Sequence, residues 1–370
     1  MALASGSPHY MPPASAKKMS SDLAALPAWY ADEGSDVFLP ESRQVEWVRK
    51  NVPLLLSVGW VLGLDARYEK MSPWGWNHAL VHGLCAKGWK GGALCMAMDE
   101  VRALSSRRVA VDMLPKLRVE GTAGESWWLD SLEELARYVS SHEKLLLKAP
   151  WSGSGKGIQP LVGLPDENLC GWIRRIIRTQ GGMVCEPFYN KVEDFAMEFH
   201  ASAGRVSFAG YSLFEADARG IYKENWLATD GAIEECLSQY VPKRVLEDIR
   251  RELLQELPLV LGNVYQGYLG VDMMVVLTSE GYAVHPCVEI NLRMNMGVVS
   301  RLFFDRHVCP QACGRYVIEY YPHEGDALAF HERMRAEHPA RFHMGRLLEG
   351  YLSLTPVFPD TSYQIYVLVK

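Results

Sequence analysis

The sequence predicts a protein of mixed α/β and α+β class with more than one hydrophobic core, and three observations lead to this. The chain has 370 residues, 48% of them hydrophobic, which is enough apolar material for roughly two or three cores. The neighbouring stretches 268–276 and 282–292 alternate apolar and polar residues, as strands do. The stretches 169–177 and 242–257 repeat apolar residues at helical spacing, so we expect amphipathic helices there.

The strand predicted at 282–292 ends in a chemically distinctive pattern. Glu289, Asn291 and Arg293 occupy every second position, with apolar residues between them. Because side chains alternate across a strand, one carboxylate, one amide oxygen and one guanidinium then point together away from the core. Two oxygen ligands beside a cation suit magnesium and phosphate.

The two predicted strands form a hairpin through the turn-like residues 278–281. Folding the chain back at this turn brings Asp272 roughly opposite residues 287–289. A second carboxylate would then reach the same metal ion. The alternative is an ordinary amphipathic hairpin whose exposed face happens to carry charges.

A second motif is an apolar strand that ends at Lys148 and continues into a loop of small residues, 152–157. Such loops let backbone N–H groups close on phosphate oxygens. A Walker A loop is excluded, because Gly157 follows Lys156 and Pro150 stands where the first glycine should be. The glycine spacing also fails the Rossmann fingerprint. A plain flexible loop remains the alternative.

Taken together, these residues resemble the ATP-grasp superfamily over about residues 145–300, with the elements in family order. The resemblance implies a fold in which two α+β subdomains clasp ATP, and an activity in which a carboxylate is activated as an acyl phosphate. It implies metal binding by Asp272, Glu289 and Asn291. Arg293 and Lys223 would serve in catalysis at the reacting groups.

The resemblance also implies the nucleotide contacts. Lys148 and Lys223 match the phosphate lysines, Glu186 the adenine contact, and the backbone around Phe188 the hinge. Asp194 matches the ribose ligand, with Glu193 as a close rival. The residues expected to bind nucleotide are Lys148, Ser152, Gly153, Ser154, Gly155, Lys156, Gly157, Glu186, Phe188, Asp194 and Lys223.

The domain organisation follows from composition and the motifs. We expect a disordered extension over 1–35, a small α/β domain over 36–121, and a subdomain with the glycine-rich loop over 122–190. The subdomain with the metal site spans 191–320, and a C-terminal helix and strand pack on the core over 321–370. Within the last part, 330–351 is expected to be helical and 364–370 to be a strand. The aromatic turn 72–77 either plugs the core of the first domain or lines the acceptor site.

Charge and cysteine usage narrow the functional classes. A net charge of −6 gives no general attraction to nucleic acid or to an anionic membrane, and no apolar stretch is long enough to span a bilayer. Eight scattered cysteines favour a reducing, cytoplasmic setting.

These observations favour an ATP- and magnesium-dependent ligase that joins a carboxylate to an amine. We expect ATP and Mg²⁺ as cofactors, with two ions and with Mn²⁺ able to substitute. The partners would be small-molecule or peptide carboxylates and amines, without nucleic acid or membrane, and the chain would be able to form a homodimer. The alternatives are an ATP-grasp-type kinase acting on a small molecule and a non-catalytic nucleotide-binding scaffold.

Overall fold

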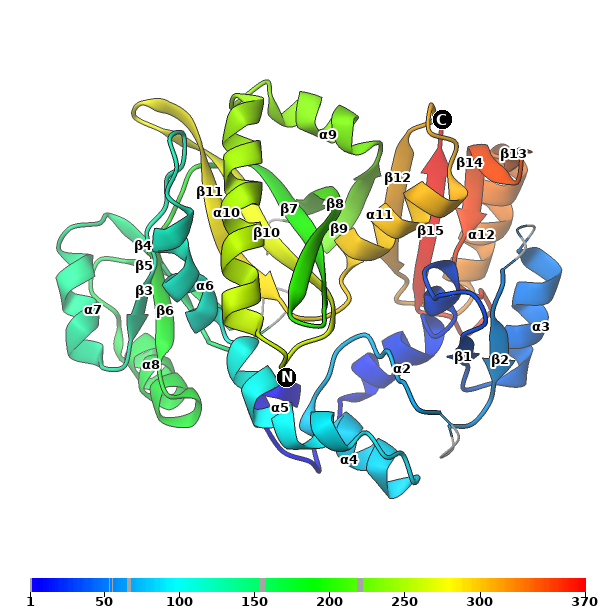
Figure 1. Ribbon diagram of the computed structural model, residues 1–370, viewed down its shortest axis with the longest axis horizontal. Coiled ribbons are helices and arrows are strands. Elements are labelled where there is room, and N and C mark those ends of the chain that lie inside the picture. The colour runs from blue at the N-terminus through cyan, green and yellow to red at the C-terminus, as the bar shows by residue number, and fades with distance from the viewer. Residues whose placement is uncertain (1, 53, 55, 65–67, 153–156, 218–221) are drawn as a thin grey trace.

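The structure is a computed structural model that describes residues 2–52, 54, 56–64, 68–152, 157–217 and 222–370. In Figure 1 a small subdomain lies at the left, a long twisted sheet fills the centre, and the N-terminal segments run along the lower edge. Among the helices formed by these residues, none has the length and apolar character needed to cross a membrane.

The central sheet has nine strands in the order β11-β10-β7-β8-β9-β12-β15-β14-β13, and all its pairings are antiparallel. Consecutive strands β7, β8 and β9 pair directly, as expected for an antiparallel meander. The hairpin predicted from alternation is confirmed, because β10 pairs with β11. In chain order, the first five strands of this sheet are β7 (Lys191–Ser202), β8 (Arg205–Ala216), β9 (Tyr222–Leu227), β10 (Gly267–Thr278) and β11 (Gly281–Asn291).

One face of this part of the sheet is covered by a long helix, α10 (Lys243–Leu261), which stands in front of β7 and β10 in Figure 1. Its buried residues, including Leu246 and Ile249, join one core with Phe195, Met197 and Phe199 of β7. The predicted helix over 242–257 is therefore confirmed. Since β7 buries its odd-numbered residues here, its even-numbered residues face the other side. The shorter α9 (Asp230–Leu237) packs beside α10.

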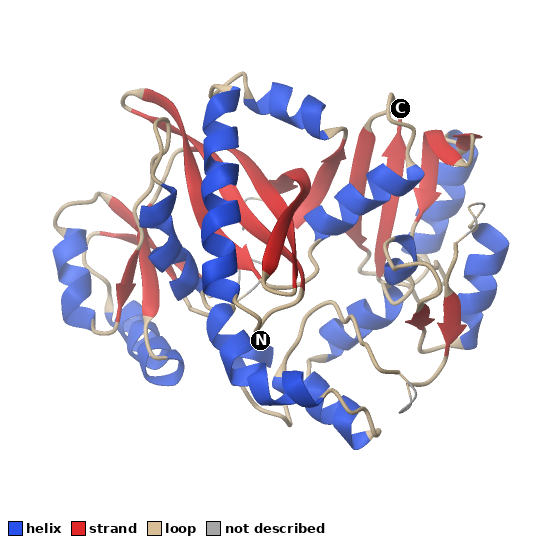
Figure 2. Ribbon diagram, viewed as in Figure 1, coloured by secondary structure: helices blue, strands red, loops and turns tan. Residues whose placement is uncertain are grey.

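A separate four-stranded sheet, in the order β3-β6-β4-β5, forms the subdomain with the glycine-rich loop. Figure 2 shows its two helices flanking the strands. Leu145 and Leu147 of β4 pack with Ile173 of α8, which confirms the predicted helical stripe over 169–177. The elements are β3 (Trp127–Leu129), α7 (Leu132–Val139), β4 (Lys144–Lys148), β5 (Ile158–Val162), α8 (Glu167–Gln180) and β6 (Met183–Pro187).

The segment 36–121 contains a parallel pair of short strands and four helices, in keeping with a small α/β unit. Its last helix, α6, is followed by a 3₁₀ turn whose residues Leu114 and Leu117 are buried in the core beneath α10. This contact brings α6 close to the central sheet. The elements are β1 (Asp36–Phe38), α3 (Ser42–Asn51), β2 (Gly59–Val61), α4 (His78–Ala86), α5 (Gly92–Leu104), α6 (Arg107–Met113) and η2 (Leu114–Leu117).

The C-terminal part extends the central sheet instead of forming only a helix and a strand on it. The expectation of a helix over 330–351 is wrong beyond Glu337, where α12 ends. Pro339 cannot continue a helix, and Met344 and Gly345, both with positive φ, form the turn between β13 and β14. The elements are α11 (Met296–His307), β12 (Gly314–Tyr320), α12 (Asp326–Glu337), β13 (Arg341–His343), β14 (Arg346–Ser353) and β15 (Tyr363–Val369).

The first 35 residues, expected to be disordered, differ from that expectation. They form α1 (Ala2–Ser5), α2 (Ala14–Asp22) and a 3₁₀ turn, η1 (Leu26–Trp29). Trp29 is 1% exposed and its indole N–H donates to the Leu354 carbonyl at 2.7 Å. The Asp22 carboxylate accepts from the backbone N–H groups of Ser362 and Tyr363 at 2.9 and 3.0 Å. The segment is thus held by contacts with the C-terminal strand that its own composition does not reveal.

This arrangement predicts that the N-terminal segment stabilises the protein. Trp29→Ala removes a buried indole and its hydrogen bond, so we expect the free energy of unfolding to fall by about 3–5 kcal/mol. Trp29→Phe keeps much of the apolar area and should cost clearly less. Urea unfolding of both variants checks this, and a Trp29→Ala variant as stable as the parent would show that the segment is not docked.

Candidate active site

The register of β10 with β11 places the predicted metal residues side by side. Asp272 pairs with Glu289, and Gly270 pairs with Asn291. The Asn291 amide nitrogen donates to Asp272 Oδ2 at 2.8 Å, and Arg293 Nη2 donates to Asn291 Oδ1 at 2.9 Å. The predicted constellation of Asp272, Glu289, Asn291 and Arg293 is therefore brought together on one face of the sheet.

The electrostatics of this group depend on burial. Burial raises the pKa of Asp272 to about 7, and the neighbouring Glu289 carboxylate adds to the shift. A divalent cation bound here would offset both effects and lower the pKa of Asp272, because it favours the charged carboxylate. Among the described residues, no three His, Cys, Asp or Glu side chains gather as a metal site. The donor set here is two carboxylates and an amide oxygen, which fits Mg²⁺ because that ion keeps several of its waters.

Arg107, at the start of α6, is a site residue that sequence reasoning missed. Its Nη2 donates to Glu289 Oε2 at 2.8 Å, and its Nη1 donates to the Ala149 carbonyl at 2.7 Å and to the Ser152 hydroxyl. One guanidinium thus joins the Glu289 carboxylate, a predicted metal ligand, to the start of the glycine-rich loop. Its Nε is buried and has no hydrogen-bond partner among the described residues. Two arginines in the first turn of a helix oppose the helix dipole, and that was the available signal.

Lys148 and Glu186 form a buried ion pair at the end of β4 and on β6. Their side chains are 6% and 4% exposed, and Lys148 pairs in register with Val184. Each therefore neutralises the other in this structure, and their contact with a nucleotide stays a prediction. An ion pair this buried is costly unless additional donors or acceptors satisfy both groups.

The glycine-rich loop is described only at its two ends. Gly157 has φ of +77°, and a Cβ added to it would lie 2.8 Å from the Cβ of Ser152 at the other end of the loop. Only glycine therefore fits at this position without strain. Trp151 anchors the loop's start, because its indole N–H donates to the Arg102 carbonyl at 2.9 Å and its ring lies against the Arg102 guanidinium. Gly153, Ser154, Gly155 and Lys156, also expected to bind nucleotide, lie outside the described residues.

The register of β7 places the two ribose candidates, Asp194 and Glu193, on opposite faces of the sheet. Asp194 pairs with Met274, in line with Ala196 opposite Asp272, so Asp194 lies on the same face as the metal residues. Its rival Glu193 lies on the other face, where it accepts from the Tyr240 hydroxyl at 3.2 Å. The Phe188 backbone N–H donates to the Lys144 carbonyl at 2.9 Å, and its ring is 49% exposed.

Lys223 is not brought to this group by any described contact. It lies exposed on β9, where its charge opposes the rise in the pKa of Glu319 that burial causes. Glu319 belongs to β12, on the far side of β9 from β8. The role of Lys223 at the phosphates stays a prediction.

The aromatic turn 72–77 packs within the N-terminal unit and also touches Arg293; that it lines an acceptor site stays a prediction. Trp76 stacks on Trp89 with ring centroids 5.5 Å apart, which is core packing within the N-terminal unit. Gly75 lies against Arg293, since a Cβ added there would be 3.2 Å from Arg293 Cβ. Trp74, Met294 and Met296 all pack against the same core cluster, which includes Trp29 and Phe303. The turn therefore covers the end of the site that Arg293 occupies.

Glu198 is a further carboxylate on this face that the sequence reasoning did not select. It is 1% exposed, and Asn295 Nδ2 donates to its Oε2 at 3.0 Å. Burial raises its pKa from the ordinary 4.5 to about 8, while the hydrogen bond from Asn295 acts in the opposite direction. A glutamate in the middle of the Phe195–Phe199 apolar alternation was the signal.

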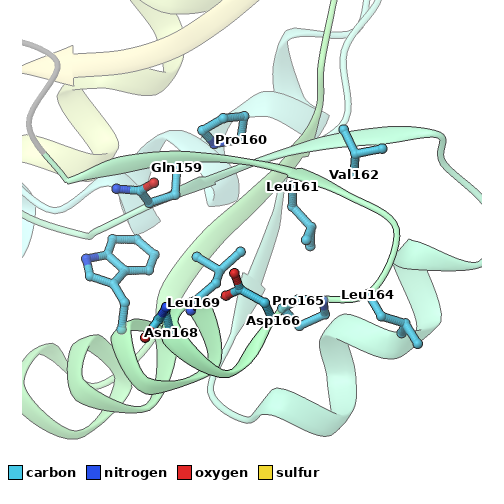
Figure 3. A pocket seen from close by; sticks show the side chains of 10 residues that line it. Gln159, Pro160, Leu161, Val162, Leu164, Pro165, Asp166, Asn168 and Leu169 are labelled. Carbon is cyan, nitrogen blue, oxygen red and sulfur yellow. Dashed lines mark hydrogen bonds between the residues drawn. The ribbon is translucent and has the colours of Figure 1, made fainter.

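A hollow of about 600 Å³ lies elsewhere, between β5 and the start of α8. Gln159 and Leu161 line it from β5, Asp166 from the N-cap of α8, and Leu169 from the helix itself (Figure 3). None of its lining residues belongs to the group described above, and it holds only one carboxylate and no cation. We assign the chemistry to the charged group on the central sheet instead.

The chain has the ATP-grasp fold. It superposes with a TM-score of 0.52 on the biotin carboxylase–beta-gamma-ATP complex from Campylobacter jejuni, at 9% identity over 94% of this chain and 85% of that chain. No protein-family model matches the chain, and no curated protein matches it in sequence.

Two other solved structures are similar over most of their length. One is N5-carboxyaminoimidazole synthetase from Staphylococcus aureus with ADP, at a TM-score of 0.49 and 11% identity over 91% of this chain and 93% of that chain. The other is N5-carboxyaminoimidazole synthase from Aspergillus clavatus with ADP and 5-aminoimidazole ribonucleotide, at 0.47 and 12% over 92% and 95%.

The buried Glu198 predicts a pH dependence of stability. Because its pKa is raised on folding, the folded state holds a proton that the unfolded state releases between pH 4.5 and about 8. Stability should therefore fall as pH rises through this window. Glu198→Gln removes the titration, so its unfolding free energy should decline less steeply, by up to about 1.4 kcal/mol per pH unit. Urea unfolding between pH 5 and pH 8 measures this.

The control for this experiment is Glu215→Gln, because Glu215 is an exposed glutamate on the neighbouring strand β8. Its pH profile should run parallel to that of the parent. If the Glu198→Gln profile is also parallel to the parent, Glu198 does not titrate in this range.

Proposed function

We propose that this protein is an ATP- and Mg²⁺-dependent ligase that activates a carboxylate as an acyl phosphate and transfers the acyl group to an amine. One observation carries the proposal: Asp272, Glu289 and Asn291 occupy adjacent register positions on one face of the sheet. Arg293 and Arg107 contact members of the same group directly. Carboxylates that can hold a metal, with guanidinium groups beside them, are what phosphoryl transfer requires.

The proposed nucleotide contacts come from both subdomains. Lys148 and Glu186 come from the small subdomain, and Asp194 and the metal group come from the central sheet. In this structure the cations are satisfied by carboxylates, as Arg107 is by Glu289 and Lys148 by Glu186. Phosphate oxygens offer these cations equivalent charge-assisted hydrogen bonds. Asp272, Glu289 and Asn291 would hold Mg²⁺, which supplies charge neutralisation at the phosphates.

The chemistry needs no protein nucleophile. A substrate carboxylate oxygen attacks the γ-phosphorus of ATP, the bond to the β-phosphate oxygen breaks, and ADP leaves. The amine then attacks the acyl carbon, loses a proton, and expels inorganic phosphate. Arg293 is placed to neutralise the acyl or phosphoryl oxygens, and Arg107 to hold the loop start over the metal carboxylate. Exclusion of water by a closed loop protects the acyl phosphate from hydrolysis.

The solved structures with this fold support the nucleotide part of the proposal, since their names include ATP- and ADP-bound complexes. The further parts are proposals as well: two magnesium ions, replacement by Mn²⁺, a homodimer, and a cytoplasmic location. The last agrees with buried thiols at Cys185 and Cys287, because reducing compartments preserve such thiols.

The direct test is thermal stabilisation by the non-hydrolysable analogue AMP-PNP with and without Mg²⁺. A ligand at 100 times its Kd stabilises the folded state by about 2.7 kcal/mol, so the melting temperature of the parent should rise only when both are present. The rise should fade in Glu289→Gln and in Lys148→Ala, and persist in Glu215→Gln. No rise in the parent at millimolar nucleotide would refute the ATP site.

Arg107 gives a second test. Arg107→Met should raise the Kd for Mg²⁺–AMP-PNP at least 10-fold, or about 1.4 kcal/mol, because a guanidinium beside Glu289 and Ser152 is lost. The matched control is Arg108→Met, since the next residue is exposed, and its contacts among the described residues, an ion pair with Asp112 and the Trp128 ring, lie outside the site. Equal affinities in the two variants, measured by calorimetry, would remove Arg107 from the site.

A further inference from the structure

The face that carries the metal residues continues to a third carboxylate, Glu198, in the next row of the sheet. Glu198 on β7 pairs with Gly270 on β10, and Gly270 pairs with Asn291 on β11. Paired residues in an antiparallel sheet point to the same face. Glu198 therefore stands two strands from Asn291, about 10 Å at the usual strand spacing.

The order of residues along β7 shows on which side of the predicted metal residues Glu198 lies. Asp194, Ala196 and Glu198 follow one another on the site face, at about 6.6 Å per step of two residues. Asp194 marks the ribose end of the proposed nucleotide site, and Ala196 lies opposite Asp272 in the metal row. Glu198 lies one step beyond the metals. A nucleotide laid along this line would place its reacting phosphate between Asp194 and Glu198, so Glu198 lies on the acceptor side.

The surroundings of Glu198 are polar but contain no ion-pair partner. It is 1% exposed, and none of the ion pairs formed between described residues includes it. Arg293 and Asp272 act on it only through their fields, in opposite directions. A buried carboxylate held by a single amide donor is far from fully compensated. A cation or a cluster of N–H donors would compensate it.

Two glycines leave room for the Glu198 carboxylate, and uncharged hydrogen-bonding groups lie close by. A Cβ added to Gly297 would lie 2.1 Å from Glu198 Oε1, and one added to Gly270 would lie 2.5 Å from Oε2. Asn225 Nδ2 donates to the Ser212 hydroxyl at 2.5 Å, and the Tyr222 hydroxyl donates to Asn225 Oδ1. Ser212 also lies at Gly297. These groups and the N-terminal end of α11 at Gly297 offset part of a negative charge, and a cation would offset the rest.

We propose that Glu198 binds the nitrogen of the second substrate as a primary ammonium group, next to the predicted metal row. This assignment rests on the proposed ligase function, of which it names the acceptor class. An ammonium offers three N–H donors and a charge, which compensates the carboxylate. Arg293, at the other side of Gly270 and Asn291, would hold the anionic reacting group. The acceptor is thus a small primary amine, and a carboxylate or a neutral hydroxyl compound is excluded from this position.

The experiment measures amine binding to the full chain saturated with Mg²⁺–AMP-PNP. The probes are ammonium, ethylammonium, glycinamide and 1,5-diaminopentane, with tetramethylammonium as a cation that lacks N–H donors and sodium chloride for ionic strength. At least one primary amine should raise the melting temperature of the parent and of Glu215→Gln, and tetramethylammonium should not. Its apparent Kd should rise at least 10-fold in Glu198→Gln.

Glu198→Gln is suited to this test because glutamine keeps the shape of the side chain and an acceptor for Asn295. If that variant binds Mg²⁺–AMP-PNP as the parent does but loses the amine, the proposal stands. If the amine binds the variant as well as the parent, or if no primary amine binds a parent that binds the nucleotide, the proposal is overturned. Failure of the parent to bind Mg²⁺–AMP-PNP would instead refute the proposed function on which it rests.

Discussion

The register between β10 and β11 is the constraint on which the rest of the site depends. Side chains alternate with a period of two, so a slip of one residue would turn Asp272 and Glu289 into the core beneath α10. The buried neighbours Val271 and Ile290, which join that core, hold the register, because the opposite arrangement would bury charges and expose valine and isoleucine. The same register extends through β7, and it places Asp194 and Glu198 on the face with the metal residues. Apolar packing on one side of the sheet thus fixes the chemistry on the other.

A second feature is that opposite charges in the site pair with one another in this structure. Arg107 contacts Glu289, Lys148 contacts Glu186, and Arg293 reaches Asp272 through Asn291. Binding of a metal–phosphate complex would exchange these partners without creating unpaired charge. Arg107 couples three parts of the chain in this exchange. It lies on α6 of the segment 36–121, and it contacts both Ser152 at the loop start and the Glu289 carboxylate.

Much of the fold and half of the site could be predicted because they follow local patterns. The alternation around Glu289 predicts the strand and the face, and the turn at 278–281 predicts the pairing with Asp272. Arg107 could not be found this way, because its role depends on η2 docking under α10, a contact between distant parts of the chain. The order of the first 35 residues likewise depends on Asp22 and Trp29 meeting the C-terminal strands. The helix expected over 330–351 ends before Pro339. Proline has no backbone N–H and its ring clashes with the preceding helical turn, which apolar spacing does not overcome.

The most direct measurement of the central claim is a crystal structure of the protein with AMP-PNP and Mn²⁺, located by its anomalous scattering. The account predicts manganese in contact with Asp272, Glu289 and Asn291, phosphate oxygens beside Arg107 and Lys148, and the ribose near Asp194. Manganese bound elsewhere, or a nucleotide lying away from β10 and β11, would contradict it.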